Sequence, residues 1–160
     1  MSTDTTGTVV RHSVTVEASL DKAFSVFTDD IGSWWPPEHH LGQVVEMVFE
    51  PRVGGQIYDR MADDSESHWA RVLAYEPPTR LVFSWDVSPA WQIEADPNRT
   101  SEVEVRFTPE GPTTTRIDVE HRHLERHGEG WEQVRDAVDS EGGWPLGLAR
   151  FRDRLGELSP

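Results

Sequence analysis

The sequence contains no cysteine among its 160 residues. Disulfide bonds, zinc sites with thiolate ligands, iron–sulfur clusters and cysteine nucleophiles are therefore all excluded. No apolar run approaches the ~18 residues that a membrane-spanning helix needs. The first twenty residues also lack the basic start and apolar stretch of a secretion signal. These absences predict a cytoplasmic protein with no membrane partner.

Positive charge is scarce as well. The chain has 15 basic and 29 acidic side chains, which gives a formal net charge of −14. Such a surface repels phosphate backbones and anionic lipid, and no run rich in lysine or arginine offers a local exception. We therefore expect no nucleic-acid partner. The Gly-x-Ser-x-Gly motif of hydrolases is missing too. Gly54-Gly55 does not belong to a phosphate-binding P-loop, because the lysine and the serine or threonine of that motif do not follow it.

The length fits one domain, since domains typically have about 100–200 residues. Residues 1–8 are rich in serine, threonine and glycine and predict a disordered N-terminal tail. Residues 9–158 contain no internal repeat and no interdomain linker, so we expect them to form a single domain.

Hydrophobic periodicity predicts an antiparallel sheet of about seven strands. Apolar residues alternate with polar ones from Val10 to Val16, and this period of two returns in six segments between Gln43 and His121. One face of these strands is apolar and the other charged, which is typical of a sheet covered on one side. In the strand from His68 to Tyr75 either face could point inward.

Helical spacing appears after the first strand and again at the C-terminal end. Ser19 is a candidate N-cap for a short helix, and Asp29-Asp30 could begin a second one that Pro36-Pro37 would end. Gly142-Gly143 interrupts the helical pattern that begins at Trp131. A long helix then presents one apolar stripe, made of Trp144, Leu148, Phe151, Leu155 and Leu158. Because an apolar sheet face needs a cover, the sequence predicts a two-layer α+β domain.

Three segments and two Gly-Trp pairs carry a family resemblance. They are Phe49–Gly55, Glu76–Trp85 and Thr115–His121, with Gly130-Trp131 and Gly143-Trp144. Together they resemble the activator of heat-shock protein 90 ATPase homologue family, which belongs to the START-like (SRPBCC) superfamily of helix-grip folds. The resemblance covers about Val10 to Leu155.

The resemblance implies a seven-stranded sheet curved around a long C-terminal helix, with a cavity between them. The superfamily mostly uses that cavity for apolar molecules such as lipids, polyketides and hormones. A few members catalyse cyclisation or dehydration there, and the eukaryotic namesake binds a chaperone. This chain is more acidic than a surface that docks on a chaperone would suggest.

Aromatic side chains are the main candidates for a ligand site. A small-molecule site needs a mostly apolar cavity with a few polar groups. For the walls and lid we select Trp34, Trp35, Trp85, Trp91, Trp144, Leu148 and Phe151, with Tyr58 and His121 as polar contacts. The alternative is that the tryptophans simply fill the core.

Histidines raise the questions of acid–base chemistry and of metal binding. His121 and His12 share the inward phase of their strands, where each is either satisfied by a neighbour or free to orient a ligand or act as a base. Glu38-His39-His40 and the group of His121, His123 and His127 lack an evident third metal ligand at suitable spacing. We expect no metal and no cofactor. Asp86 and Glu120, on the outward phase, are predicted to be surface charges.

These patterns favour a domain that binds a hydrophobic or aromatic small molecule between sheet and terminal helix. The alternatives are an enzyme that uses the same cavity, with His121 as acid or base, and a co-chaperone-like interaction module whose partner is a chaperone. The sequence favours binding over catalysis and is compatible with a monomer or a homodimer.

Overall fold

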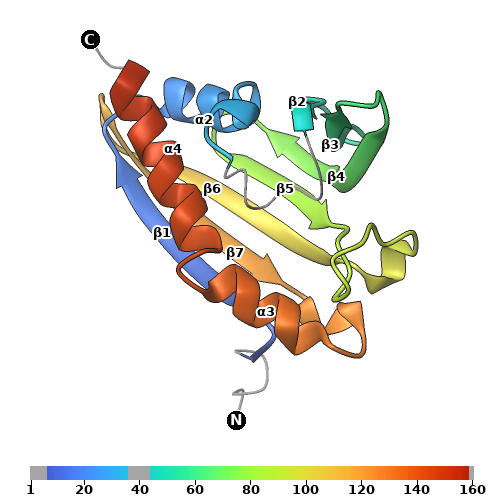
Figure 1. Cartoon of the computed structure of the whole chain (residues 1–160). Helices are drawn as coiled ribbons and strands as arrows, with labels where there is room; N and C mark the ends of the chain where they lie inside the picture. Colours follow the sequence, from blue (N-terminus) through green and yellow to red (C-terminus); the bar gives the residue numbers. More distant parts are fainter. Residues whose placement is uncertain (1–6, 36–43, 159–160) are drawn as a thin grey trace.

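A computed structural model describes residues 7–35 and 44–158 of the chain. Its sheet has seven strands in the order β1-β7-β6-β5-β4-β3-β2, and every neighbouring pair is antiparallel. The predicted sheet is thus confirmed (Figure 1). The strands are β1 (Val10–Val16), β2 (Val44–Phe49), β3 (Gln56–Met61), β4 (Glu66–Glu76), β5 (Arg80–Trp85), β6 (Ser101–Gly111) and β7 (Thr114–Arg122).

The helices gather on one face of this sheet. Figure 1 shows α3 and α4 crossing that face one after the other, with α2 beside the far end of α4. The arrangement confirms the predicted α+β helix-grip fold. The helices are α2 (Leu20–Thr28), α3 (Trp131–Asp139) and α4 (Trp144–Leu158), and the short 3-10 turns are η1 (Ile31–Ser33), η3 (Pro97–Arg99) and η4 (Leu124–His127). None of the helices in the described part of the chain is long and apolar enough to cross a membrane.

The region after β1 forms as its sequence predicts, with one difference. The Ser19 side chain accepts a hydrogen bond from the backbone N–H of Lys22, so this residue caps α2. The second predicted helix is only the 3-10 turn η1, and the side chain of Asp30 makes no capping bond to it. The proline pair predicted to end it lies outside the described residues, as does most of the predicted tail, residues 1–8.

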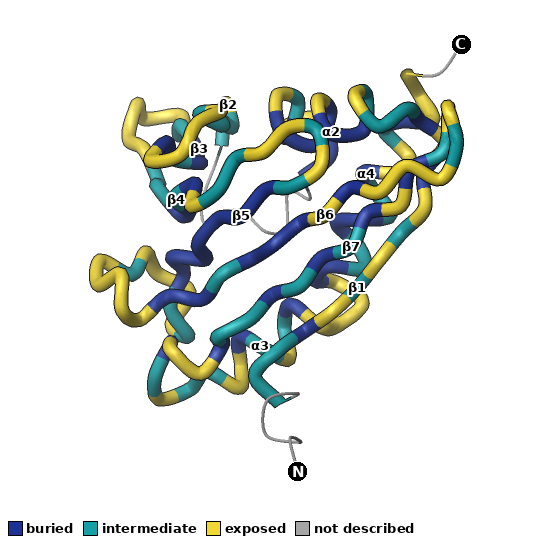
Figure 2. Tube along the Cα trace, turned by 180° about the vertical axis from the view of Figure 1, so that it is seen from behind, coloured by how far each residue is buried: buried dark blue, intermediate teal, exposed yellow. Residues whose placement is uncertain are grey.

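The apolar stripe of α4 holds the two layers together. Trp144, Leu148, Phe151 and Leu155 are all buried against the sheet, whereas Leu158 at the end of the helix is 37% exposed. Their partners on β5, β6 and β7 are the inward-facing residues of the alternating pattern. These are Leu81, Phe83, Trp85, Val103, Val105, Phe107, Thr115, Ile117, Val119 and His121. Figure 2 shows the buried stretches running along the central strands, with the exposed residues at the turns.

Strand β4 uses both of its possible faces. Its pairing with β3 shifts register at Ile57/Tyr58, and its pairing with β5 shifts again at Val72/Ala74. Each irregularity changes which face the following residues present. Trp69 and Ala70 are consequently both buried although they are adjacent.

On the outer face of the sheet, the prediction that Asp86 is a surface charge is wrong. Asp86 is 6% exposed, and Arg71 donates two hydrogen bonds to its carboxylate, at 3.0 and 3.1 Å. A carboxylate is costly to bury unless it is paired, so the ion pair with Arg71 is what allows Asp86 to lie there. Glu120 is only partly buried and pairs with Arg11 at 3.2 Å.

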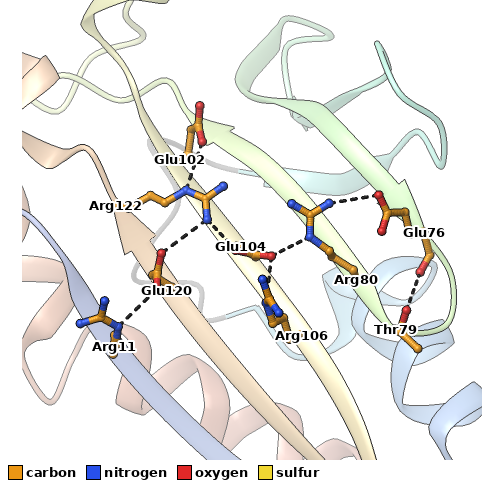
Figure 3. Close-up of polar contacts among 9 residues, drawn as sticks. All are labelled: Arg11, Glu76, Thr79, Arg80, Glu102, Glu104, Arg106, Glu120 and Arg122. Carbon is orange, nitrogen blue, oxygen red and sulfur yellow. Dashed lines mark hydrogen bonds and ion pairs between the residues drawn. The ribbon is translucent and has the colours of Figure 1, made fainter.

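A buried glutamate organises the centre of the outer face. Glu104 on β6 is 5% exposed and receives hydrogen bonds from Arg80 at 2.6 Å, Arg106 at 2.9 Å and Arg122 at 2.5 Å (Figure 3). Burial opposes its ionisation, but the three guanidinium groups outweigh that effect and hold the pKa of Glu104 at about 2. Ion pairs therefore satisfy the buried charge on the outer face of the sheet, while apolar side chains pack against the inner face.

Candidate functional site

Five tryptophans from different elements meet between the sheet and α4. We call Trp34, Trp35, Trp69, Trp85 and Trp144 the tryptophan cluster. The rings of Trp35 and Trp69 are stacked with centroids 5.0 Å apart, and Trp35 lies 5.9 Å from Trp144 and 6.4 Å from Trp85. All five side chains are at least nine-tenths buried.

The residues of the tryptophan cluster come from the sheet, from α4 and from the segment after η1. Trp34 and Trp35 follow the turn η1, Trp69 and Trp85 come from β4 and β5, and Trp144 is the first residue of α4. Trp34 continues the aromatic packing into α4 through Phe151, at a centroid distance of 5.2 Å. Edge-on and tilted contacts dominate, which suits the charge distribution of aromatic rings.

Other predicted site residues lie elsewhere. Trp91, on the loop between β5 and β6, is 45% exposed and has a left-handed φ of 59°. Tyr58 on β3 is half-buried and stacks on His68 at 4.4 Å. Leu148 is buried in the apolar core beneath α4. A contact between any of these residues and a ligand stays a prediction.

A buried chain of polar side chains adjoins the tryptophan cluster. Trp144 donates its indole N–H to Nδ1 of His121, with 3.2 Å between the nitrogens. The Ser101 hydroxyl lies 2.7 Å from Nε2 of His121 and 2.8 Å from Nε2 of His127. Ser101, His121 and His127 are all fully buried. We call Trp144, His121, Ser101 and His127 the polar chain.

Both histidines of the polar chain favour the neutral form. Burial, and then the neighbouring His127, lower the pKa of His121 from 6.5 to about 3. Burial also lowers the pKa of His127, although the charges of Glu94 and Asp86 oppose that effect. His121 is therefore neutral near neutral pH, and a neutral imidazole has one ring nitrogen that accepts a hydrogen bond and one that donates.

One polar atom next to this chain is left without a partner. The indole Nε1 of Trp85 is buried and has no hydrogen-bond partner among the described residues. Trp85 lies 5.1 Å from the ring of His121, measured between centroids. A buried donor without an acceptor costs about 1–3 kcal/mol, so a ligand oxygen that reached Trp85 would remove that cost.

The sequence analysis did not select Ser101 and Trp69 for this site, and it considered His127 only as a metal ligand. Ser101 shares the inward phase of Val103 and Val105, so the alternation on β6 could have identified it. Trp69 was obscured by the irregular pairing of β4. No group of three metal-ligating side chains occurs in the described part of the chain. Glu38-His39-His40 lies outside the described residues.

A groove of about 450 Å³ on the outer face is a less suitable site. Four of its arginines already pair with carboxylates of the same groove. The pairs are Arg11 with Glu120, Arg106 and Arg122 with Glu104, and Arg116 with Asp118. These groups satisfy one another, whereas the inner site offers an unpaired donor.

Comparison with known proteins identifies the family of the chain. The family model described as activator of Hsp90 ATPase homolog 1-like protein matches residues 17–156. The chain belongs to this family. The match covers most of the sheet and nearly all of α4, so the family fold and the resemblance of the sequence agree. A search of curated proteins found no match.

Three solved structures illustrate what the chain is similar to. The anthrahydroquino-γ-pyrone synthase Txn09 is 40% identical, with a TM-score of 0.67 over 91% of this chain and 96% of Txn09. CalC of Micromonospora echinospora, a self-sacrificing resistance protein, is 31% identical, with a TM-score of 0.71 over 96% of this chain and 97% of CalC. The Aha1 dimer of Colwellia psychrerythraea is 14% identical, with a TM-score of 0.62 over 92% of this chain and 95% of the Aha1 chain, and shows the shared fold alone.

Proposed function

We propose that this member of the family binds a fused aromatic small molecule between the sheet and α4. The observation that carries the proposal is the tryptophan cluster, which gathers five large aromatic rings at one end of a buried polar chain. Aromatic faces favour flat aromatic ligands, and each Å² of apolar surface removed from water contributes roughly 25 cal/mol. The name of Txn09, a synthase of an anthrahydroquinone fused to a γ-pyrone, supports the same ligand class.

The polar groups add a preference for oxygen-bearing ligands. The free indole N–H of Trp85 suits a ligand carbonyl, and Nδ1 of His121 suits a ligand hydroxyl if the indole of Trp144 gives way. A few polar groups within a mostly apolar lining are what small-molecule sites use for orientation. Hydroxyanthraquinones carry both functions on one flat ring system.

Tryptophan fluorescence tests this proposal directly. We expect quinizarin, a dihydroxyanthraquinone, to quench the emission of the wild-type protein and to raise its melting temperature. Trp85→Phe should weaken binding by roughly tenfold, because a lost hydrogen bond is worth about 1.5 kcal/mol. The matched control is Trp131→Phe, a tryptophan of α3 that lies outside the cluster and packs against Arg135.

Native mass spectrometry of gently purified protein provides an independent test. A copurified aromatic molecule would support the proposal. Unchanged fluorescence with quinizarin and with a panel of aromatic and lipid-like compounds, together with a ligand-free mass, would contradict it.

Catalysis on the same ligand is the second candidate function. The specific observation in its favour is the position of His121, whose ring lies 5.1 Å from that of Trp85 and 6.2 Å from that of Trp144. Its Nε2 also lies 2.7 Å from the Ser101 hydroxyl, so a polar group of the protein reaches the tryptophan cluster. A His121→Ala variant that turned over a candidate substrate as fast as the wild type would exclude this assignment.

A chaperone partner receives no support from a particular surface of the described residues. The charge of −14 and the 40% identity with Txn09 over 91% of this chain both favour the ligand. The cytoplasmic location and the choice between monomer and homodimer stay predictions.

A further inference from the structure

The hydrogen bonds of the polar chain fix the direction in which its protons point. Nδ1 of His121 accepts the indole N–H of Trp144, so the neutral ring of His121 carries its proton on Nε2. That N–H donates to the oxygen of Ser101, 2.7 Å away. The Ser101 hydroxyl can then donate to Nε2 of His127, at 2.8 Å, which leaves the proton of His127 on Nδ1.

The two ends of the chain have different surroundings. His121 is enclosed by Trp85 on β5 and Trp144 on α4, and a positive charge on His127 would lower its pKa further. His127, on η4, faces the carboxylates of Glu94 and Asp86, with Arg99 as the opposing charge. A positive charge is therefore better accommodated on His127 than on His121.

We propose that His121, Ser101 and His127 form a proton relay, which moves a proton from a ligand hydroxyl in the tryptophan cluster to His127. The relay rests on the proposed function, because it needs a ligand that displaces the indole of Trp144 from Nδ1 of His121. His121 is the residue that touches the ligand, and Ser101 and His127 are positioning residues that act through it.

Each step of the relay balances. The ligand O–H bond breaks and its proton forms the Nδ1–H bond of His121. The Nε2–H proton of His121 passes to the oxygen of Ser101, and the Ser101 hydroxyl proton passes to Nε2 of His127. The ligand is left as a phenolate or an enolate, His121 and Ser101 are neutral again, and His127 holds the positive charge.

Nitrogen NMR of the histidine rings tests the relay without any ligand. We expect His121 to carry its proton on Nε2 and His127 on Nδ1 at neutral pH, and Ser101→Ala to shift the ring nitrogens of both histidines. Ser101→Thr keeps the hydroxyl and should restore the wild-type tautomers. Ser84→Ala is the matched control, because Ser84 is equally buried but bonds to the backbone of Arg71. A proton on Nδ1 of His121, or histidine signals unmoved by Ser101→Ala, would overturn the relay.

Quinizarin tests proton transfer itself, because its phenolate absorbs at longer wavelength than its phenol. In the wild type and in Ser84→Ala we expect the phenolate band at a lower pH than for the free dye. In Ser101→Ala the dye should still quench tryptophan fluorescence but lose this shift. An unchanged phenolate band in Ser101→Ala would refute the relay. A dye that fails to bind the wild type would instead contradict the proposed function, and the tautomers measured by NMR would still decide the relay.

Discussion

The most unusual residue on the outer face is Glu104, a carboxylate that lies under three guanidinium groups. Its pKa of about 2, compared with 4.5 for an unperturbed glutamate, means that the unfolded chain takes up a proton before the folded one does. The stabilisation is complete above pH 4.5 and is lost as the pH falls toward 2. Its size corresponds to about 3 kcal/mol of the free energy of unfolding.

Glu104→Gln should therefore lower the free energy of unfolding by roughly 3 kcal/mol at pH 7, because three arginines lose the carboxylate that they share. Arg80 keeps its pair with Glu76, and Arg122 keeps its pairs with Glu102 and Glu120. The deficit should shrink as the pH approaches 2, where the wild type loses the same interaction. Urea denaturation at several pH values measures both effects. Glu141→Gln, at an exposed position before α4, is the control. Coincident curves for wild type and Glu104→Gln at every pH would show that the arginine network does not stabilise the fold.

His121 affects acid stability in a different pH range. Its folded pKa of about 3 lies below its ordinary value of 6.5, so the unfolded chain binds the extra proton and stability falls as the pH drops from 6.5 toward 3. His121→Gln should be less steeply destabilised between pH 6.5 and 4.5, while part of the slope persists because burial also lowers the pKa of His127. His123→Asn is the control, since asparagine tolerates the left-handed backbone there. Identical slopes for the two variants would refute the argument.

At the scale of elements, the junction of α3 and α4 determines where Trp144 enters the site. A Cβ atom built on Gly143 would lie 2.2 Å from the carbonyl oxygen of Val138 and 2.4 Å from that of Ala137. Both are backbone atoms of α3 and cannot move aside without shifting the helix. At the neighbouring Gly142 a Cβ atom would meet nothing within 4 Å.

Gly143→Ala should cost roughly 1–3 kcal/mol of stability, because the backbone must move to relieve the overlap. The shift would also pull the indole of Trp144 away from His121, so the ring nitrogens of His121 should change in NMR. Gly142→Ala should leave stability within about 0.5 kcal/mol of the wild type, as most open positions do. Thermal melts of the pair measure the difference, and equal melting temperatures would contradict the tight junction.

The strands also show how much of the fold the sequence could predict. Strict alternation was sufficient for β1, β5, β6 and β7, because one face of each is apolar. It failed for β4, where the register shift opposite Ile57/Tyr58 buries Trp69 and Ala70 together. A register shift arises from the pairing of strands, so the two-residue pattern of one strand does not contain it.

The residues of the candidate site also differ in how far the sequence could predict them. Trp34, Trp35, Trp85 and Trp144 could be selected as large aromatics near predicted turns, on one strand and at the start of a helix. Ser101 gives no hydrophobic signal, and His127 reaches it from a 3-10 turn 26 residues later in the chain. Their contact depends on how the turn folds back onto the sheet, which no local pattern specifies.

At the scale of the whole molecule, the tryptophan cluster makes both layers depend on each other. Trp35 comes from the segment after η1, Trp85 from the sheet and Trp144 from α4, and their centroids lie 5.9 to 6.4 Å apart. Separating α4 from the sheet would expose all three. We therefore propose that residues 9–158 unfold as one cooperative domain, as most small domains do.

Urea denaturation followed by two probes examines this cooperativity. Tryptophan emission reports the contact between the layers, and far-ultraviolet circular dichroism reports the strands and helices themselves. We expect the two transitions to have the same midpoint and slope, since neither layer can bury its apolar face alone. Leu155→Ala, which truncates a buried side chain of α4 outside the cluster, should lower both midpoints together by the equivalent of about 2–5 kcal/mol. A fluorescence transition at lower urea than the dichroism transition would mean that α4 separates first and that the sheet persists without its cover.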